Sequence, residues 1–192
     1  MSTLRLTDVS LFTKQGLAIL NQPFSLTVEP GQWVRLFGHN GSGKSTLLKA
    51  IAGTHTNTSG MIAPSLDSTS LAYLPQQHEL KFDWPLSLRD VAGLFKAPTQ
   101  TPLLLELNLD RLWNDASGGE KQRLLLALTL TKKDTKLLLL DEPFNHLDQR
   151  YRQILIESLV AYRTNNPQIS AIVVDHQNLL PTQFYSLERG LE

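Results

Sequence analysis

The sequence predicts an α/β fold in which helices cover a parallel β-sheet. Three observations support this prediction. The glycine-rich segment GHNGSGKST at 38–46 lies between an apolar, strand-like run and a helix-like run. The run KLLLLDEP at 136–143 is apolar up to its two acids, as expected of a strand buried on both faces. In the last third of the chain, helix-like and strand-like segments alternate, which is typical of a parallel-sheet core.

Each element follows from a local pattern. Short alternating strands are expected in LRLTDVSL (4–11) and FSLTVEPG (24–31), and buried strands in WVRLF (33–37) and SLAYLP (70–75). A helix is expected at 44–53, where Gly53 would end it. The segment 78–115 is expected to be mostly helical, with breaks at proline and threonine. The remaining expectations are helices at 118–130 and 147–163 and strands at 136–143, 169–174 and the terminal FYSLERG.

Composition sets limits on function. The 192 residues suffice for one well-buried domain and not for two full ones. Lysine plus arginine and aspartate plus glutamate are balanced at 18 each, so we expect no nucleic-acid partner. Cysteine is absent, which fits a reducing compartment and excludes disulfides. No segment resembles a signal peptide or a membrane span, so we expect a cytosolic protein.

The segment GHNGSGKST has the spacing of a phosphate-binding loop. Gly38 is followed, after four residues, by Gly43, Lys44 and Ser45. Glycines let successive N–H groups point at one anion, and the helix starting near Lys44 adds its positive end. Lys44 is expected to reach the β- and γ-phosphates, and the Ser45 hydroxyl to coordinate Mg²⁺. The alternative, a Gly/Ser turn with a solvated lysine, is disfavoured by the flanking strand and helix.

Two further motifs are candidates for the site: a pair of acidic residues and a second helix start that can bind an anion. Asp141 and Glu142 end the apolar strand, where Asp141 could hold Mg²⁺ through water and Glu142 could deprotonate an attacking water. These acids could instead cap the following helix, but the phosphate loop in the same chain favours nucleoside triphosphate hydrolysis. In ASGGEKQR (116–123), Ser117 and two glycines at a helix start form a second anion-binding terminus. Alone, such a segment could equally be a linker or an ordinary helix start.

Six segments occur in a fixed order: GHNGSGKST, YLPQQ, ASGGEKQR, LLLLDEP, NHLD and VVDH. In this order they closely resemble the ATP-binding cassette family over nearly the whole chain. The resemblance implies a P-loop NTPase (RecA-like) fold with a parallel-sheet core, a small antiparallel β part and an inserted helical subdomain. It implies a single domain over 1–192, with the core at 1–77 and 116–192 and the helical subdomain at about 78–115.

The resemblance also assigns roles by position. The catalytic residues would be Glu142 as base, His176 at the γ-phosphate, Gln76 and Lys44. ATP would be bound by Phe12, Gly38, His39, Asn40, Gly41, Ser42, Gly43, Lys44, Ser45 and Thr46, and by Ser117, Gly118 and Gly119 of the opposite subunit. Mg²⁺ would be held by Ser45, Gln76 and Asp141, and Asp148 would cross the dimer interface. For Phe12, expected to stack on adenine, packing on the second strand face is the alternative.

The sequence departs from the family pattern at four positions. Ala116 replaces the usual leucine, and Glu120 replaces a common glutamine. Asp175 precedes His176, where it could raise the imidazole pKa and alter the tautomer. His146 stands where a small residue is commoner, and we interpret it as a solvated loop residue. The histidines His39, His55 and His78 show no zinc-type spacing, so a structural metal is not expected.

The expected role is the ATPase subunit of a membrane transporter. The chain ends just after SLERG, which argues against tandem-cassette translation factors, because these need two cassettes. DNA-repair cassette ATPases carry a long inserted coiled coil, and the lack of sustained heptads here argues against that class. The partners would be a polytopic permease, at the cytoplasmic face of the membrane, and a second copy of the chain or a paralogous cassette. The stretch YLPQQHELKFDWPLSLRDV resembles zinc and manganese uptake ATPases. Haem-export-type cassettes and a cytosolic or regulatory cassette ATPase are the alternatives.

Overall fold

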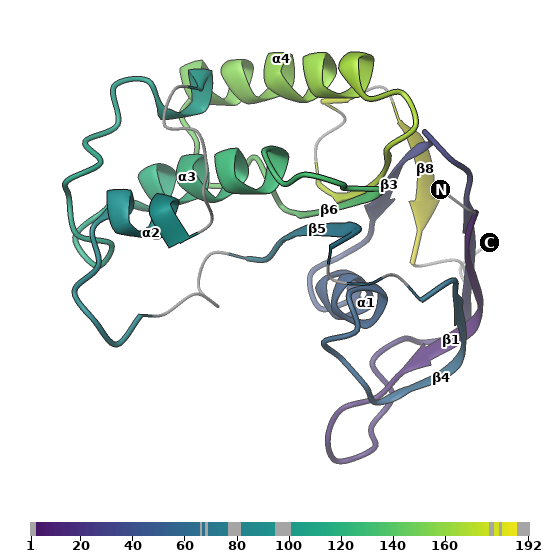
Figure 1. Cartoon of the computed structure of the whole chain (residues 1–192). Coiled ribbons are helices and arrows are strands. Elements are labelled where there is room, and N and C mark those ends of the chain that lie inside the picture. The colour runs from purple at the N-terminus through teal and green to yellow at the C-terminus, as the bar shows by residue number, and fades with distance from the viewer. Residues whose placement is uncertain are drawn as a thin grey trace.

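A five-stranded parallel sheet, in the order β5-β6-β7-β3-β8, forms the core of the computed structural model (Figure 1). Its strands are β3 (Trp33–Phe37), β5 (Leu71–Leu74), β6 (Leu137–Asp141), β7 (Ser170–Val174) and β8 (Gln183–Ser186). The structure describes residues 3–65, 67, 69–76, 82–94, 101–176, 179–180 and 182–187. A separate antiparallel sheet, in the order β2-β1-β4, contains β1 (Leu4–Leu11), β2 (Phe24–Val28) and β4 (Thr58–Ala63). The predicted α/β class with a small antiparallel part is therefore confirmed.

The central strand β6 explains why the parallel sheet is buried on both faces. Leu138 and Leu140 belong to one apolar cluster, which also includes residues of α3 and α4. Leu137 and Leu139 point the other way, into a second cluster with α1 and the antiparallel sheet. Successive side chains of a strand face opposite sides, so an unbroken apolar run serves two layers at once. Figure 1 shows the same layering, with α3 and α4 on one side of the sheet and α1 on the other.

The helices around the sheet begin and end close to the predicted positions. They are α1 (Lys44–Ile51), α3 (Gly118–Leu130) and α4 (Gln149–Asn165). Gly53 follows α1 with a φ of 73°, the left-handed conformation that ends many helices. Among the helices formed by the described residues, none is long and apolar enough to cross a bilayer.

A bulge in β1 keeps its apolar side chains on one face. Strict alternation would put Leu4 and Leu6 on the face opposite Val9 and Leu11, yet all four are buried. The register shifts between Leu6 and Val9 against both neighbouring strands, and Asp8 has a φ of 48°. Gly60 lies opposite, where an added Cβ would be 2.3 Å from the Asp8 carbonyl oxygen. The extra residue thus reverses the alternation, at the cost of requiring a glycine across from it.

The segment between β5 and α3 is less helical than predicted. Its described parts contain only α2 (Leu88–Leu94) and the short 3₁₀ helix η2 (Pro102–Leu104). Two stretches of this segment are also joined by backbone hydrogen bonds. The Leu88 N–H donates to the Arg111 carbonyl, and the Trp113 N–H donates to the Leu86 carbonyl. Residues 78–81, including His78, and residues 95–100 lie outside the described part. Taken together, the described parts 82–94 and 101–115 are therefore not mostly helical, and that prediction is wrong for them.

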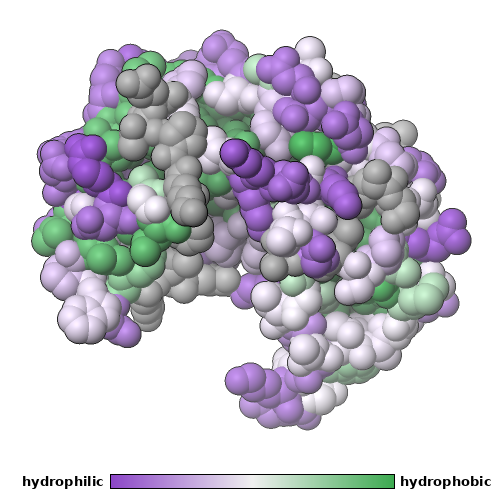
Figure 2. Space-filling view, viewed as in Figure 1, coloured by the Kyte–Doolittle hydropathy of each residue, from purple (hydrophilic) through white to green (hydrophobic). Residues whose placement is uncertain are grey.

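Residues 82–94 and 101–115, here named the α2 segment, and the antiparallel sheet lie at opposite sides of the molecule. Figure 2 shows the surface hollowed between the side that carries α2 and the side that carries β1 and β4. Hydrophobic side chains appear on this face in separate groups among hydrophilic ones. Within the α2 segment, Phe82 packs edge-on against Trp113 with ring centroids 5.2 Å apart, whereas Trp84 is 76% exposed. Of these two aromatic residues, Phe82 therefore packs internally and Trp84 faces solvent.

Candidate functional site

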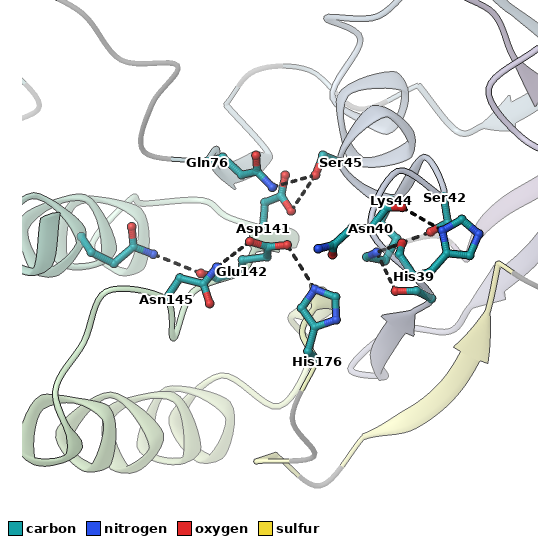
Figure 3. Close-up of polar contacts among 12 residues, drawn as sticks. His39, Asn40, Ser42, Lys44, Ser45, Gln76, Asp141, Glu142, Asn145 and His176 are labelled. Atoms are coloured by element: carbon teal, nitrogen blue, oxygen red, sulfur yellow. Dashed lines mark hydrogen bonds and ion pairs between the residues drawn. The ribbon is translucent and has the colours of Figure 1, made fainter.

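The predicted phosphate loop, magnesium ligands and catalytic residues meet at the carboxyl edge of the parallel sheet. The loop 38–43 follows β3, Asp141 is the last residue of β6, and His176 comes shortly after β7. In Figure 3 these side chains, together with Gln76, surround one region between α1 and the ends of the strands. This edge is where open parallel sheets bind ligands, because the loops after neighbouring strands converge there.

Lys44 is held by the loop that precedes it. Its Nζ donates to the carbonyl oxygens of Gly38 and His39, each at 2.8 Å, and lies 3.4 Å from the Ser42 Oγ. Gly41 and Gly43 have φ angles of 84° and 90°, which other residues adopt only with strain. The loop can therefore curl around the ammonium group, and Lys44 as a whole is 5% exposed. The same curl places a cation and the start of α1 beside one another, as phosphate binding requires.

A chain of hydrogen bonds links Ser45, Asp141 and Gln76, the three residues that the family resemblance assigned to Mg²⁺. The Ser45 hydroxyl donates to Asp141 Oδ1 at 3.0 Å and accepts from the Gln76 amide at 3.2 Å. The three side chains supply hydroxyl, carboxylate and amide oxygens, which are the hard donors that Mg²⁺ prefers. The described residues contain no group of three histidine, cysteine or acidic side chains placed for a metal ion. This donor set fits Mg²⁺ that also takes ligands from phosphate and water.

The Glu142 carboxylate is held from two sides. Asn145 Nδ2 donates to Glu142 Oε2 at 2.5 Å, and His176 Nε2 lies 3.4 Å from Oε1. The Glu142 backbone N–H donates to the Val174 carbonyl, and its φ of 51° turns the chain away from β6. Gln122 on α3 donates to the Pro143 carbonyl at 3.1 Å. Sequence reasoning assigned Glu142 and His176 but missed Asn145 and Gln122, whose contacts depend on the shape of this turn.

A pocket of about 370 Å³ opens among these groups. It is lined by Ile19, Asn40, Gly41, Gly43, Lys44, Ser45, Thr46, Gln76 and Glu142. Nothing in the sequence indicated that Ile19 would line the site. Phe12 is not among the lining residues; it is half-buried and bridges to Ala18, so its stacking on adenine stays a prediction. A larger pocket of about 700 Å³ lies against β5, α2 and α3, but its lining is mainly apolar and lacks these polar groups.

The segment Ser117–Gly119 forms the start of α3, apart from the pocket lining. Ser117 Oγ accepts from the Glu120 N–H, and the Glu120 carboxylate accepts from the Ser117 N–H, which makes a capping box. A Cβ on Gly119 would lie 2.8 Å from the His146 carbonyl oxygen, so only glycine fits without displacing the chain. Asp148 caps α4 by accepting from the Tyr151 N–H at 2.9 Å, and its place at a dimer interface stays a prediction.

Comparison with known proteins decides the family. A family model described as ABC transporter matches residues 21–145. The chain belongs to the ABC transporter family. The predicted resemblance to the ATP-binding cassette family is thereby confirmed. A solved structure of the ATP-binding subunit of an ABC transporter superposes with a TM-score of 0.73, covering 91% of this chain and 80% of that one. At 23% identity, this likeness supports the fold alone.

Curated relatives in the ABC family differ in length and in the activity their names state. The zinc import ATP-binding protein ZnuC of Jannaschia sp. is 35% identical over 163 residues, or 78% of this chain and 65% of ZnuC. The manganese transport system ATP-binding protein MntB of Halalkalibacterium halodurans is 30% identical over 200 residues. That match covers 93% of this chain and 78% of MntB. YheS of Haemophilus influenzae, named a probable ATP-binding protein, is 38% identical over 170 residues. That match covers 81% of this chain but only 25% of YheS.

Proposed function

We propose that this chain binds ATP with Mg²⁺ and hydrolyses the γ-phosphate bond. The observation that supports this proposal is the convergence of Lys44, Ser45 and Glu142 on one pocket at the sheet edge, where Asp141 accepts a hydrogen bond from Ser45. A nucleotide needs a cation for its phosphates, oxygen ligands for its metal and a base for the attacking water. Residues that follow β3 and residues at the end of β6 would together meet these three requirements.

Each residue has a separate task in the proposed reaction. Lys44 would exchange its contacts with the loop carbonyls for contacts with the β- and γ-phosphates. Bound Mg²⁺ would be held by Ser45, Gln76 and Asp141, and it supplies charge neutralisation at the phosphates. Glu142 would accept the proton of the attacking water, and its carboxylate is already oriented by Asn145 and faces His176. His176 would then lie between the base and the γ-phosphate.

The working unit would be a head-to-tail pair of cassettes. The helix start at Ser117–Gly119 can bind an anion, yet these residues do not line the pocket that holds Lys44 and Ser45. A two-fold dimer lets each such segment complete the ATP site of the facing subunit. Asp148, at the start of α4, would contact the partner in this arrangement.

The hydrolysis proposal is tested by Glu142→Gln and Lys44→Ala. Glu142→Gln should keep ATP binding and lose turnover by about a hundredfold or more, because the amide fits but accepts no proton. Lys44→Ala should weaken ATP binding itself. The measurements are phosphate release and binding of a fluorescent ATP analogue to the purified chain. Wild-type phosphate release by Glu142→Gln would refute the assignment of the base.

The proposed task of the ATPase is to drive a membrane permease for zinc or manganese uptake. Identities of 35% to ZnuC and 30% to MntB support metal uptake, because the names of both relatives state transport of those metals. The exposed indole of Trp84 supports a partner surface on the proposed subdomain at 78–115. An exposed aromatic ring of this size gains apolar contact when a partner covers it.

A second candidate is a cassette ATPase that acts without a permease. The 38% identity to YheS favours it, because that relative is named for ATP binding and not for transport. The two candidates make opposite predictions for fractionation. As a transporter subunit, the affinity-tagged chain should be recovered from detergent-extracted membranes together with a polytopic protein, and Trp84→Ala should reduce that recovery severalfold. Recovery of the wild-type chain from the soluble fraction without a membrane protein would favour the second candidate.

A further inference from the structure

We propose that Arg111 is a positioning residue that neutralises Glu120, so that the start of α3 can accept the γ-phosphate of ATP. The inference rests on the proposed sharing of ATP between two cassettes, and it assigns a role to a residue that no motif singled out. Arg111 lies in the segment before α3, and Glu120 lies in the first turn of α3. The Arg111 Nη1 is 2.9 Å and 3.1 Å from the two carboxylate oxygens of Glu120.

The Glu120 carboxylate has a structural task that fixes its position. One oxygen accepts from the Ser117 N–H at 2.8 Å, and the Glu120 N–H donates to Ser117 Oγ at 3.3 Å. Because the serine oxygen acts as an acceptor here, its own hydroxyl hydrogen is available to donate to a phosphate. The capping box therefore presents the Ser117 hydroxyl, and Glu120 holds it in place.

This task brings a negative charge to an anion-binding helix start. A carboxylate in the first turn stabilises the helix, but it repels a phosphate that approaches the same N–H groups. Burial alone would raise the pKa of Glu120, yet the hydrogen bonds with Ser117 and the charge of Arg111 lower it below its usual value. Glu120 is therefore ionised at neutral pH, and the repulsion needs a nearby cation to offset it.

Arg111 supplies that cation from a fixed position. Its carbonyl oxygen accepts from the N–H of Leu88, the first residue of α2, and its N–H donates to the Asn108 carbonyl. Its side chain is 44% exposed, so it can be replaced without opening the core, while the Glu120 side chain is 19% exposed. The neighbouring Lys121 lies over the Trp113 ring, 5.6 Å from its centroid. Among the described residues, the ion pair that Glu120 makes is with the Arg111 guanidinium.

The test is a double-mutant cycle in the full chain carrying Glu142→Gln, so that ATP is bound but not consumed. The variants are Arg111→Ala, Glu120→Gln and both together, and the measurement is the ATP concentration at half-maximal dimerisation by analytical ultracentrifugation. Arg111→Ala should raise that concentration about threefold to tenfold, because Glu120 is left uncompensated. Glu120→Gln alone should change it less than about twofold, since the amide oxygen can still accept from Ser117. The double variant should return to within about twofold of the parent.

Arg89→Ala is the matched control. Arg89 pairs with Asp110 at 2.8 Å in the same segment, so its loss changes the charge equally without touching Glu120, and dimerisation should be unaffected. Binding of a fluorescent ATP analogue to the monomer should be the same for all variants, and thermal unfolding should show that each variant remains folded. If the double variant stays as impaired as Arg111→Ala, the neutralising role is refuted. If the Glu142→Gln parent never dimerises with ATP, the shared-site proposal fails instead, independently of Arg111.

Discussion

Glu142 and His146 begin and end a tight turn, and both have positive φ angles, 51° and 63°. Each such angle strains a residue that carries a side chain, and it persists only where the surroundings hold it. Here Gln122 holds the Pro143 carbonyl, and the His146 carbonyl rests against Gly119. The strain therefore lies next to the proposed base, and the turn fixes where its carboxylate points.

Asn145 is the residue in this turn that we expect to matter for turnover. Asn145→Ala should lower kcat about tenfold, because the Glu142 carboxylate loses the donor on Oε2 and its orientation toward water. ATP affinity of the monomer should change less than about twofold, since Asn145 does not line the described pocket. Steady-state phosphate release and analogue binding separate the two effects. Asn165→Ala, at the exposed end of α4, is the control, and an unchanged kcat in Asn145→Ala would mean that Glu142 is oriented without it.

At the scale of elements, the Glu106 carboxylate connects the α2 segment to α4. It accepts from Arg150 Nη1 and Nη2 at 2.8 and 2.9 Å, and from the Tyr151 hydroxyl at 3.1 Å. The hydrogen bonds from Arg150 and then Tyr151 lower the pKa of Glu106 from its ordinary value of 4.5. All of these contacts are exposed to solvent, so their contribution to stability is small and is screened by salt.

The lowered pKa gives this contribution a defined pH dependence. A carboxyl whose pKa is lower in the folded state stabilises that state above its unfolded pKa and loses this effect as pH falls through the folded pKa. Glu106→Gln should lower Tm by about 1–3 °C at pH 7, and the difference from wild type should shrink as pH falls below about 4.5. Glu157→Gln is the control for charge removal, because Glu157 lies on α4, the helix that carries Arg150 and Tyr151. A difference that stays constant between pH 7 and pH 3.5 in calorimetry would contradict this account.

Sequence predicted those elements whose pattern is local. The strand β6 and the helix α3 were predicted because an apolar run and a Ser-Gly-Gly cap mark them. Lys44, Ser45 and Asp141 were predicted with them, since each lies at a strand end or a helix start. The strand β4 was missed because most of its side chains are exposed and show no apolar alternation. The α2 segment was mispredicted because its backbone bonds to partners about twenty residues away, and no period in the sequence shows this.

At the scale of the whole molecule, the shared ATP site predicts complementation between subunits. Lys44→Ala and Ser117→Arg should each abolish ATP trapping alone, the first by removing the phosphate cation and the second by filling the γ-phosphate position. In a mixed dimer, one site carries both changes and the other joins an intact phosphate loop to an intact Ser117 segment. The mixture should therefore recover ATP-dependent dimerisation and about one trapped nucleotide per dimer.

Differently tagged subunits show whether mixed dimers form, and radiolabelled ATP measures trapping. The wild-type chain diluted with each single variant is the control. If mixed dimers form but trap no more nucleotide than either variant alone, each ATP is bound within one subunit and the head-to-tail arrangement is refuted.

The contacts of Lys44 make the phosphate loop a closed ring around its own cation. In the proposed ATP site, a nucleotide would therefore compete with the Gly38 and His39 carbonyls, and Lys44 would exchange one set of oxygen partners for another. The affinity gained through Lys44 is the difference between these two sets, not the full strength of the new one.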